Sequence, residues 1–170
     1  MELGEDVKDE VSEQEGTWRL ERLTSDSEVA ARDLVRGQWG HDEALRVFGK
    51  EGNPGCIADE GLPAHFVMVD GLSEVVAHAK LLRSDDKAVV QSVVVDPRRR
   101  RSGIGTRLMS MLATEAKRAK LSSIYLRTPD MAPFYESCGF QKTTDGRGPY
   151  QWSKPCPARK GEWLSRRLAQ

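Results

Sequence analysis

One stretch of this chain constrains its fold more than any other: a valine-rich run, an arginine- and glycine-rich loop, and an amphipathic segment follow one another. The run Ala88–Val95 has the composition of a buried strand and ends at Asp96-Pro97, where proline stops ladder pairing. Beyond the loop, Ile104, Leu108 and Leu112 recur at helical spacing. A strand that delivers such a loop to a helix N-terminus makes an anion site, because unpaired amides and the helix dipole favour negative charge.

The spacing within this loop separates three kinds of phosphate site. A P-loop ends in Gly-Lys-Ser/Thr, which is missing here, and a dinucleotide fingerprint needs a third glycine where Leu108 stands. The pattern that remains is Arg/Gln-x-x-Gly-x-Gly/Ala, which Arg100, Gly103 and Gly105 match. We therefore expect the loop to bind a diphosphate group.

The rest of the chain predicts a mixed α/β fold in one domain. Alternating apolar residues and β-branched runs predict strands, and apolar residues three and four positions apart predict helices. The expected elements are a strand at 18–23, helices at 25–39 and 42–50, strands at 65–69, 75–82 and 88–95, a helix from 104, a strand at 122–128, a helix at 132–138, and strands opening at 140 and 150. They make a central sheet of about seven strands flanked by about four helices.

Composition limits the function classes. The 170 residues contain no apolar run near the roughly 18 that span a bilayer. Three widely spaced cysteines indicate neither a disulfide framework nor a metal site. We therefore expect a cytoplasmic monomer without metal or membrane binding. The formal net charge is zero, which argues against nucleic acid as a partner, because such binders carry a positive field.

The charges are unevenly distributed along the chain. Residues 1–16 hold seven acidic side chains against one lysine and show no apolar periodicity, so they are expected to form an acidic disordered arm. Residues 156–170 are rich in arginine and lysine and are expected to form a basic C-terminal tail. The folded domain would then comprise residues 17–155.

A second motif lies downstream of the loop, where residues 134–140 read Phe-Tyr-Glu-Ser-Cys-Gly-Phe. Together the two motifs resemble the GCN5-related N-acetyltransferase (GNAT) superfamily, and the resemblance covers residues 88–140. In that superfamily the loop binds the diphosphate of acetyl-CoA, and the tyrosine often protonates the departing thiolate. The resemblance therefore implies a GNAT fold, acetyl-CoA as co-substrate and an acetyl-transfer activity.

The resemblance also assigns the cofactor-binding residues. Backbone amides of the loop would hold the diphosphate, and the end of the preceding strand would pair with the pantetheine arm as an added strand does. The implied cofactor-binding residues are Val93, Val94, Val95, Arg100, Arg101, Ser102, Gly103, Ile104, Gly105, Thr106 and Phe134.

The catalytic roles follow from the same resemblance. Tyr135 would be the general acid, and a backbone amide near Val93 would stabilise the tetrahedral oxyanion. An amine of pKa about 8 needs little help to lose a proton at neutral pH. If a base is used, His78, Gln91 or Ser92 could act through an ordered water.

A narrower resemblance points to the actin N-terminal acetyltransferases of the NatH type. It rests on Gln38-Trp39 followed by Arg46, on Val76–Leu81, and on Ile124–Thr128. Those enzymes modify the processed, strongly acidic amino terminus of actin, so the implied partner is an acidic protein N-terminus. Arginine binds carboxylates bidentately. The candidate substrate-binding residues are Trp39 as a wall and Arg46, Lys80, Arg83 and Arg127 as a basic rim.

Two other readings remain open at this point. The acceptor could be a small amine or a lysine side chain rather than a protein N-terminus. The chain could also be a non-catalytic acetyl-CoA-binding module, although the presence of both loop glycines and Tyr135 argues against this.

Overall fold

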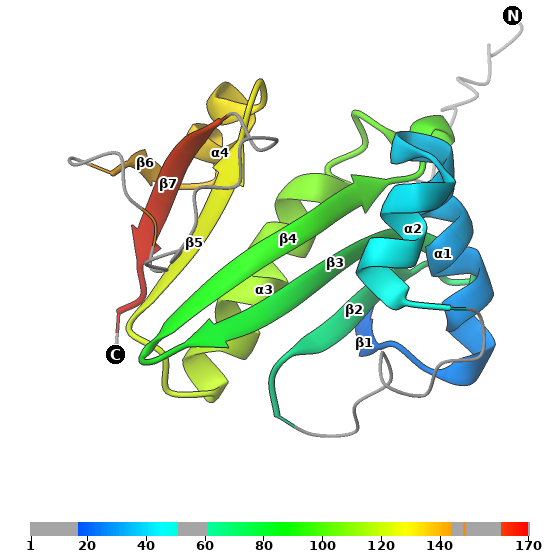
Figure 1. The fold of residues 1–170 in the computed structure, drawn as a ribbon, viewed down its shortest axis with the longest axis horizontal. Helices are drawn as coiled ribbons and strands as arrows, with labels where there is room; N and C mark the ends of the chain where they lie inside the picture. Colours follow the sequence, from blue (N-terminus) through cyan, green and yellow to red (C-terminus); the bar gives the residue numbers. More distant parts are fainter. Residues whose placement is uncertain (1–16, 51–60, 144–147, 149–160, 170) are drawn as a thin grey trace, which may run out of the picture.

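The computed structural model describes residues 17–50, 61–143, 148 and 161–169. The predicted arm 1–16 and the predicted strand at 150 lie outside these residues. The elements are β1 (Arg19–Arg22), α1 (Ser25–Trp39), α2 (His41–Phe48), β2 (Ala64–Val69), β3 (Val75–Ser84), β4 (Lys87–Val95), the 3₁₀ turn η2 (Pro97–Arg99), α3 (Ile104–Arg118), β5 (Ser123–Thr128), α4 (Ala132–Ser137), β6 (Gln141–Lys142) and β7 (Glu162–Arg167). The predicted fold class is confirmed, since the described residues form one seven-stranded mixed sheet with four α-helices (Figure 1).

The strand order is β1-β2-β3-β4-β5-β7-β6, and every neighbouring pair is antiparallel except β4 and β5. Strand β7 therefore lies inside the sheet, between β5 and β6. This corrects the prediction that residues 156–170 form a tail. Leu164 and Leu168 are buried in the main core, so two apolar side chains fix this basic segment against the domain.

The two parallel strands stay together over a short distance only. Residues Lys87 to Val89 of β4 pair with Ser123 to Tyr125 of β5, and no further pairs follow. Beyond this point the strands diverge, and Figure 1 shows the resulting V between them. The open end of the V is the end that leads into η2 and α3.

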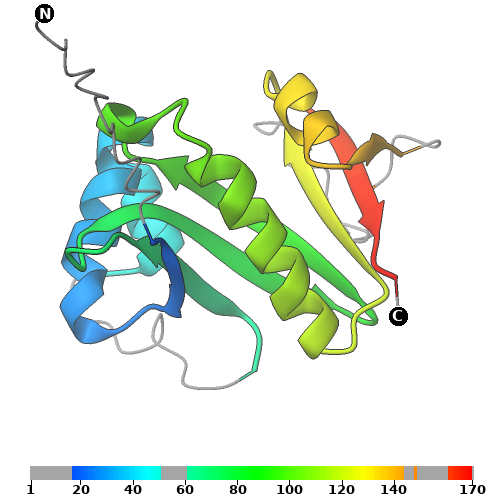
Figure 2. The same cartoon turned by 180° about the vertical axis from the view of Figure 1, so that it is seen from behind.

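Helices cover the two faces of the sheet unequally. Helix α3 crosses one face, where Ile104, Leu108 and Leu112 pack on the inward side chains of β2 to β5 (Figure 2). Helices α1 and α2 cover the other face over β2 to β4 only, where Val35 and Phe48 belong to a second core cluster. The face of β5 and β7 beside them has no helix over it among the described elements. None of the described helices combines the length and apolar character that crossing a membrane requires.

Candidate active site

A cavity lies where β4 and β5 diverge. It has a volume of about 760 Å³ and brings together four parts of the chain: the end of α1, the second half of β4 with the arginine loop, the end of β5, and α4. Its lining residues are Gln38, Trp39, residues 90–95, Arg99, Arg100, Arg101, residues 103–106, residues 126–131, Phe134 and Tyr135. Of the predicted cofactor-binding residues, only Ser102 is not part of this lining.

The arginine loop presents backbone amides at the mouth of the cavity. Gly103 is the N-cap of α3 and has φ 84°, the left-handed region that glycine adopts without strain. No side chain among the described residues caps this helix end. The first-turn amides therefore remain available to an external acceptor, and the helix dipole favours an anionic one.

Side-chain hydrogen bonds hold the loop in this shape. Asp96 accepts from the backbone N–H of Arg98 at 2.9 Å and forms a salt bridge with its guanidinium at 2.8 Å. Ser102 Oγ donates to the carbonyl of Arg99 at 2.5 Å. Ser102 therefore shapes the loop from outside the cavity.

Position 105 requires glycine because neighbouring side chains approach its Cα closely, and not because of its backbone angles. A Cβ built there would lie 3.1 Å from Cζ of Phe134 and 3.8 Å from Cγ2 of Val95. The absence of a side chain lets the first turn of α3 pack directly against α4 and β4. The two sequence motifs therefore touch each other in the fold.

The loop arginines have different partners. Arg99 bridges Asp70 at 3.1 Å and Glu74 at 3.3 Å, which ties the loop to the turn between β2 and β3. Arg100 donates to Gln38 Oε1 at 2.5 Å and to the carbonyl of Val95 at 3.3 Å. Within the described part of the chain, the Arg101 guanidinium makes no hydrogen bond or salt bridge, so its charge is available to an anion in the cavity.

Tyr135 lies on α4 and lines the same cavity as the loop. Its ring meets those of Phe134 and Phe140 edge-on, with centroids 5.0 Å and 6.1 Å away. Burial raises its pKa to about 12, with Cys138 and Asp130 acting in the same direction. The phenol is therefore protonated at neutral pH and can donate a hydrogen bond or a proton into the cavity.

The three candidate bases occupy different environments. Gln91 and Ser92 line the cavity, whereas His78 does not and is fully buried. Both ring nitrogens of His78 are hydrogen-bonded, one to His65 and one to the carbonyl of Ser92. Burial, with a smaller contribution from His65, lowers the pKa of His78 to about 3. A base needs access to the substrate, so this position suits a structural residue rather than a base.

The predicted substrate-binding residues do not all meet. Trp39 and Arg127 line the cavity, and Trp39 is 43% exposed. Arg46, Lys80 and Arg83 are absent from the lining. Arg46 lies on the outer side of α2, where it bridges Glu43 at 3.4 Å. The basic rim of the cavity instead consists of Arg127 and the loop arginines.

The fold adds residues that the sequence did not single out. Asp130 and Met131 line the cavity between the end of β5 and α4, and the N–H of Met131 donates to Thr128 Oγ1 at 3.0 Å. His65 emerges as the partner of His78. No local pattern marks these positions, because they meet the site only through the sheet order.

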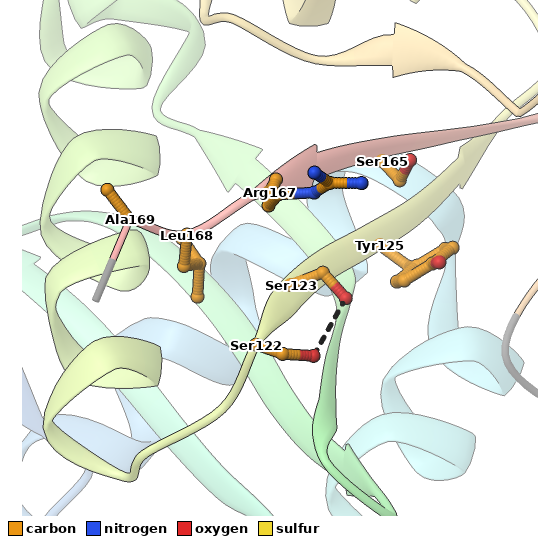
Figure 3. A pocket seen from close by; sticks show the side chains of 7 residues that line it. All are labelled: Ser122, Ser123, Tyr125, Ser165, Arg167, Leu168 and Ala169. Atoms are coloured by element: carbon orange, nitrogen blue, oxygen red, sulfur yellow. Dashed lines mark hydrogen bonds between the residues drawn. The ribbon is translucent and has the colours of Figure 1, made fainter.

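A second cavity, of about 520 Å³, lies on β5 and β7 near the end where β4 and β5 are paired. Figure 3 shows Ser123 and Tyr125 on β5 beside Ser165 and Arg167 on β7. Ser122, also in its lining, donates to Asp86 at 2.6 Å. The residues that line this second cavity include no acid and base in contact with each other. The cavity between β4 and β5 therefore remains the candidate active site. The described residues also contain no group of His, Cys, Asp and Glu that could hold a metal ion.

The family comparison matches most of the part of the chain that builds this site. The acetyltransferase (GNAT) domain family matches residues 62–142. Mycothiol acetyltransferase from Rhodococcus erythropolis is 42% identical over 81 residues, which cover 45% of this chain and 27% of that protein. The chain therefore spans about a quarter of this curated relative.

Solved structures agree on the fold. An acetyltransferase of the GNAT family from Staphylococcus aureus has a TM-score of 0.68 at 16% identity, over 89% of this chain and 99% of that one. N-acetylglutamate synthase from Neisseria gonorrhoeae, complexed with coenzyme A and N-acetyl-glutamate, has a TM-score of 0.67 at 16% identity, over 90% of this chain and 35% of that one. Residues 62–142 thus match the acetyltransferase (GNAT) domain family, and the solved structures share the fold of this chain.

Proposed function

We propose that this protein is a cytoplasmic, monomeric N-acetyltransferase that transfers acetyl from acetyl-CoA to the acidic amino terminus of a protein, with processed actin as the leading candidate. The observation that carries the transfer itself is that the uncapped α3 N-terminus and Tyr135 line one cavity. A thioester bound between them would have its anionic end on the loop and its sulfur near a protonated phenol.

The cavity suits coenzyme A. Its mouth offers loop amides and the free Arg101 charge for the diphosphate, and the edge of β4 at Val93 to Val95 offers backbone groups and apolar side chains to a long amide-bearing arm. Acetyl-CoA supplies the acyl thioester that the acceptor amine attacks. The N–H near Val93 would donate to the carbonyl oxygen, where negative charge develops.

Tyr135 is proposed as the general acid. Its protonated phenol would donate to the leaving sulfur, which otherwise departs as a thiolate. Ser92 and Gln91 line the same cavity and would orient a water that takes the proton from the amine. Little basicity is required, because an α-amino group has a pKa of about 8.

The proposed acceptor follows from charge. Arg99, Arg100, Arg101 and Arg127 all reach the cavity, against Asp130 alone, so the lining carries an excess of positive charge. Trp39 is an exposed aromatic wall at the same mouth. An acidic peptide would gain charge-assisted hydrogen bonds there, and a lysine-bearing peptide would be repelled. The resemblance to the NatH type supports the same acceptor.

A second acceptor class is favoured by one observation. The relative with 42% identity over 81 residues is named for mycothiol rather than for a protein N-terminus. A small amine, or a lysine side chain, is therefore the alternative acceptor.

A peptide panel tests the acceptor. With acetyl-CoA present, release of free thiol is measured for peptides that begin Asp-Asp-Asp, Glu-Glu-Glu, Ala-Ala-Ala or Lys-Lys-Lys, for an amino-blocked peptide with an internal lysine, and for a polyamine. We expect the acidic peptides to show the highest kcat/KM. Equal or faster turnover of the polyamine or the internal lysine would replace the proposed acceptor with the alternative one.

A further inference from the structure

Two buried histidines lie behind the active-site cavity, outside its lining. His65 on β2 is 4% exposed and His78 on β3 is 0% exposed. Their rings are 5.3 Å apart, and Nδ1 of His65 lies 3.0 Å from Nε2 of His78. A buried imidazole loses hydration free energy and is retained only where hydrogen bonds compensate for the loss. The partners of this pair therefore indicate what it does.

A third partner fixes where the protons lie. Nδ1 of His78 is 3.1 Å from the carbonyl oxygen of Ser92, and a carbonyl can only accept. His78 must then carry its proton on Nδ1. Burial keeps the pKa of both rings low, about 3 for His78 and about 4 for His65, so both are neutral at pH 7. The bare Nε2 of His78 therefore accepts from Nδ1–H of His65.

The hydrogen bonds from His65 to His78 and from His78 to the Ser92 carbonyl form a relay. The Ser92 carbonyl at its end belongs to a bulge in β4. His78 is paired with Val94 and Lys80 with Gln91, so three steps along β4 match two along β3. Ser92, within the extra stretch, has φ 54°, a left-handed value that costs a non-glycine residue about 1 kcal/mol. A bulge leaves its extra residue outside the ladder. The Ser92 carbonyl therefore accepts a hydrogen bond from Nδ1–H of His78 instead of from a backbone N–H of the neighbouring strand.

The other end of the relay reaches the two helices over this face. Phe48 of α2 stacks on His65 with centroids 5.0 Å apart and contacts His78 at 4.9 Å. Arg32 of α1 lies over the Phe48 ring at 5.1 Å and donates to the carbonyl of Gly49 at 2.7 Å. A continuous set of contacts thus runs from α1 and α2 through both histidines to β4.

We propose that His65 and His78 are positioning residues: they hold the Ser92 carbonyl, and with it the β4 bulge, in the shape that acetyl transfer requires. This inference rests on the acetyl-transfer activity proposed above. The bulge lies within residues 91–95, all of which line the cavity. The diphosphate loop has its own supports at Asp96 and Ser102, so loss of the relay should move the reacting region while leaving the cofactor anchor in place.

Paired substitutions test this role. His78→Leu removes both ring hydrogen bonds, whereas His78→Asn keeps an N–H at about the place of Nδ1 and can still donate to Ser92. We expect kcat of the leucine variant to fall about tenfold, because small displacements at a reacting centre are costly. The asparagine variant should regain most of that loss. We expect both variants to bind coenzyme A with the same Kd as the wild type, as measured by calorimetry.

These measurements separate positioning from mere support of the fold. A structural role alone would lower the melting temperature of both variants and leave kcat per folded molecule unchanged, and that result would overturn the proposal. Absence of acetyl transfer by the wild type to any amine would remove the proposed function and this role together. Full turnover by His78→Leu in an otherwise active enzyme would remove this role alone.

A spectroscopic measurement covers the case in which His78→Leu does not fold. In ¹⁵N-labelled wild-type protein, long-range ring spectra assign the tautomer of each histidine, with exposed His41 as the internal reference. We expect both His65 and His78 to carry their proton on Nδ1. A proton on Nε2 of His78 would contradict the relay.

The milder variant His65→Leu keeps the hydrogen bond from His78 to Ser92. We expect it to lower kcat about threefold, because one neutral hydrogen bond is lost. An unchanged kcat would show that His65 has no positioning role.

Discussion

The two sides of the active-site cavity are built in different ways. The proposed cofactor side is mainly one stretch, from Gln91 in β4 to Thr106 in α3, and its proposed binding groups are chiefly backbone amides. The proposed acceptor side is assembled from Gln38 and Trp39 at the end of α1, the end of β5, and α4, and its proposed binding groups are side chains.

This difference has physical consequences. Backbone amides bind an anion whatever the neighbouring side chains are, provided that glycine lets the ligand and the helix approach. Side chains from separate elements bind only when the whole sheet places them together. Damage to the cofactor side should therefore abolish binding, whereas changes on the acceptor side should alter rate and choice of substrate.

The largest effect is expected on the cofactor side. Gly105→Glu would press a side chain into Phe134 and set a negative charge beside the diphosphate, so coenzyme A affinity should fall at least about a thousandfold. Calorimetric titration measures it. The matched control is Gly37→Glu, at an exposed helical glycine with open space around it. Normal binding by Gly105→Glu would show that the diphosphate lies elsewhere.

Acid should act on the histidine pair behind the β4 bulge, on the cofactor side. The pKa of His65 is lowered to about 4 and that of His78 to about 3, chiefly by burial, from 6.5. Between these values and 6.5 the unfolded chain binds more protons than the folded one, so stability is full above pH 6.5 and falls as the pH drops. One imidazole shifted from 6.5 to about 4 accounts for a loss of about 3 kcal/mol.

Urea unfolding at a series of pH values measures this loss. The double variant His65→Asn, His78→Asn should reduce the slope of stability against pH between pH 6.5 and 4. A wild-type stability that stays level over this interval would mean that the pair is not buried and neutral.

Tyr135→Phe tests the proposed general acid on α4. The ring contacts with Phe134 and Phe140 remain, so stability and coenzyme A affinity should be preserved. Removal of the proton donor should lower kcat about a hundredfold. Steady-state kinetics with the best acceptor peptide measures it, and Tyr125→Phe, on β5 outside this cavity, is the control. Equal losses in both variants would argue against the acid role.

Arg127→Gln is expected to have the smallest effect, and it probes the acceptor side alone. The KM for a peptide that begins Asp-Asp-Asp should rise about tenfold, as expected for the loss of one charge-assisted pair. The KM for acetyl-CoA should not change. Arg46→Gln, on the outer side of α2, serves as the control. If both substitutions raise KM equally, the acidic terminus binds over α2 instead of in the cavity.

Much of the fold could be predicted from the sequence because its signals are local. The helix predicted at 25–39 spans α1, and the strand predicted at 88–95 differs from β4 by one residue. Apolar spacing and turn residues decide these elements within a few positions of chain. The loop motif was recognisable for the same reason, since Arg100, Gly103 and Gly105 act through local backbone geometry.

The errors arose where long-range contacts decide the outcome. Charge composition predicted a tail at 156–170, but two buried leucines insert β7 into the sheet. His78 was considered as a base because it stands in a strand near the motif. The structure instead turns its ring away from the cavity toward His65, a partner that only the pairing of β2 with β3 brings within reach.

The amino-acid sequence by itself determined most of the helices and strands, the arginine- and glycine-rich loop and the phenol of the second motif, because these depend on periodicity and on glycine at particular steps. The tertiary structure decided which side chains surround the cavity, which arginines keep a free charge, and what His78 does. Those properties depend on the divergence of β4 from β5 and on the bulge at Ser92, where the packing of distant segments outweighs local preference.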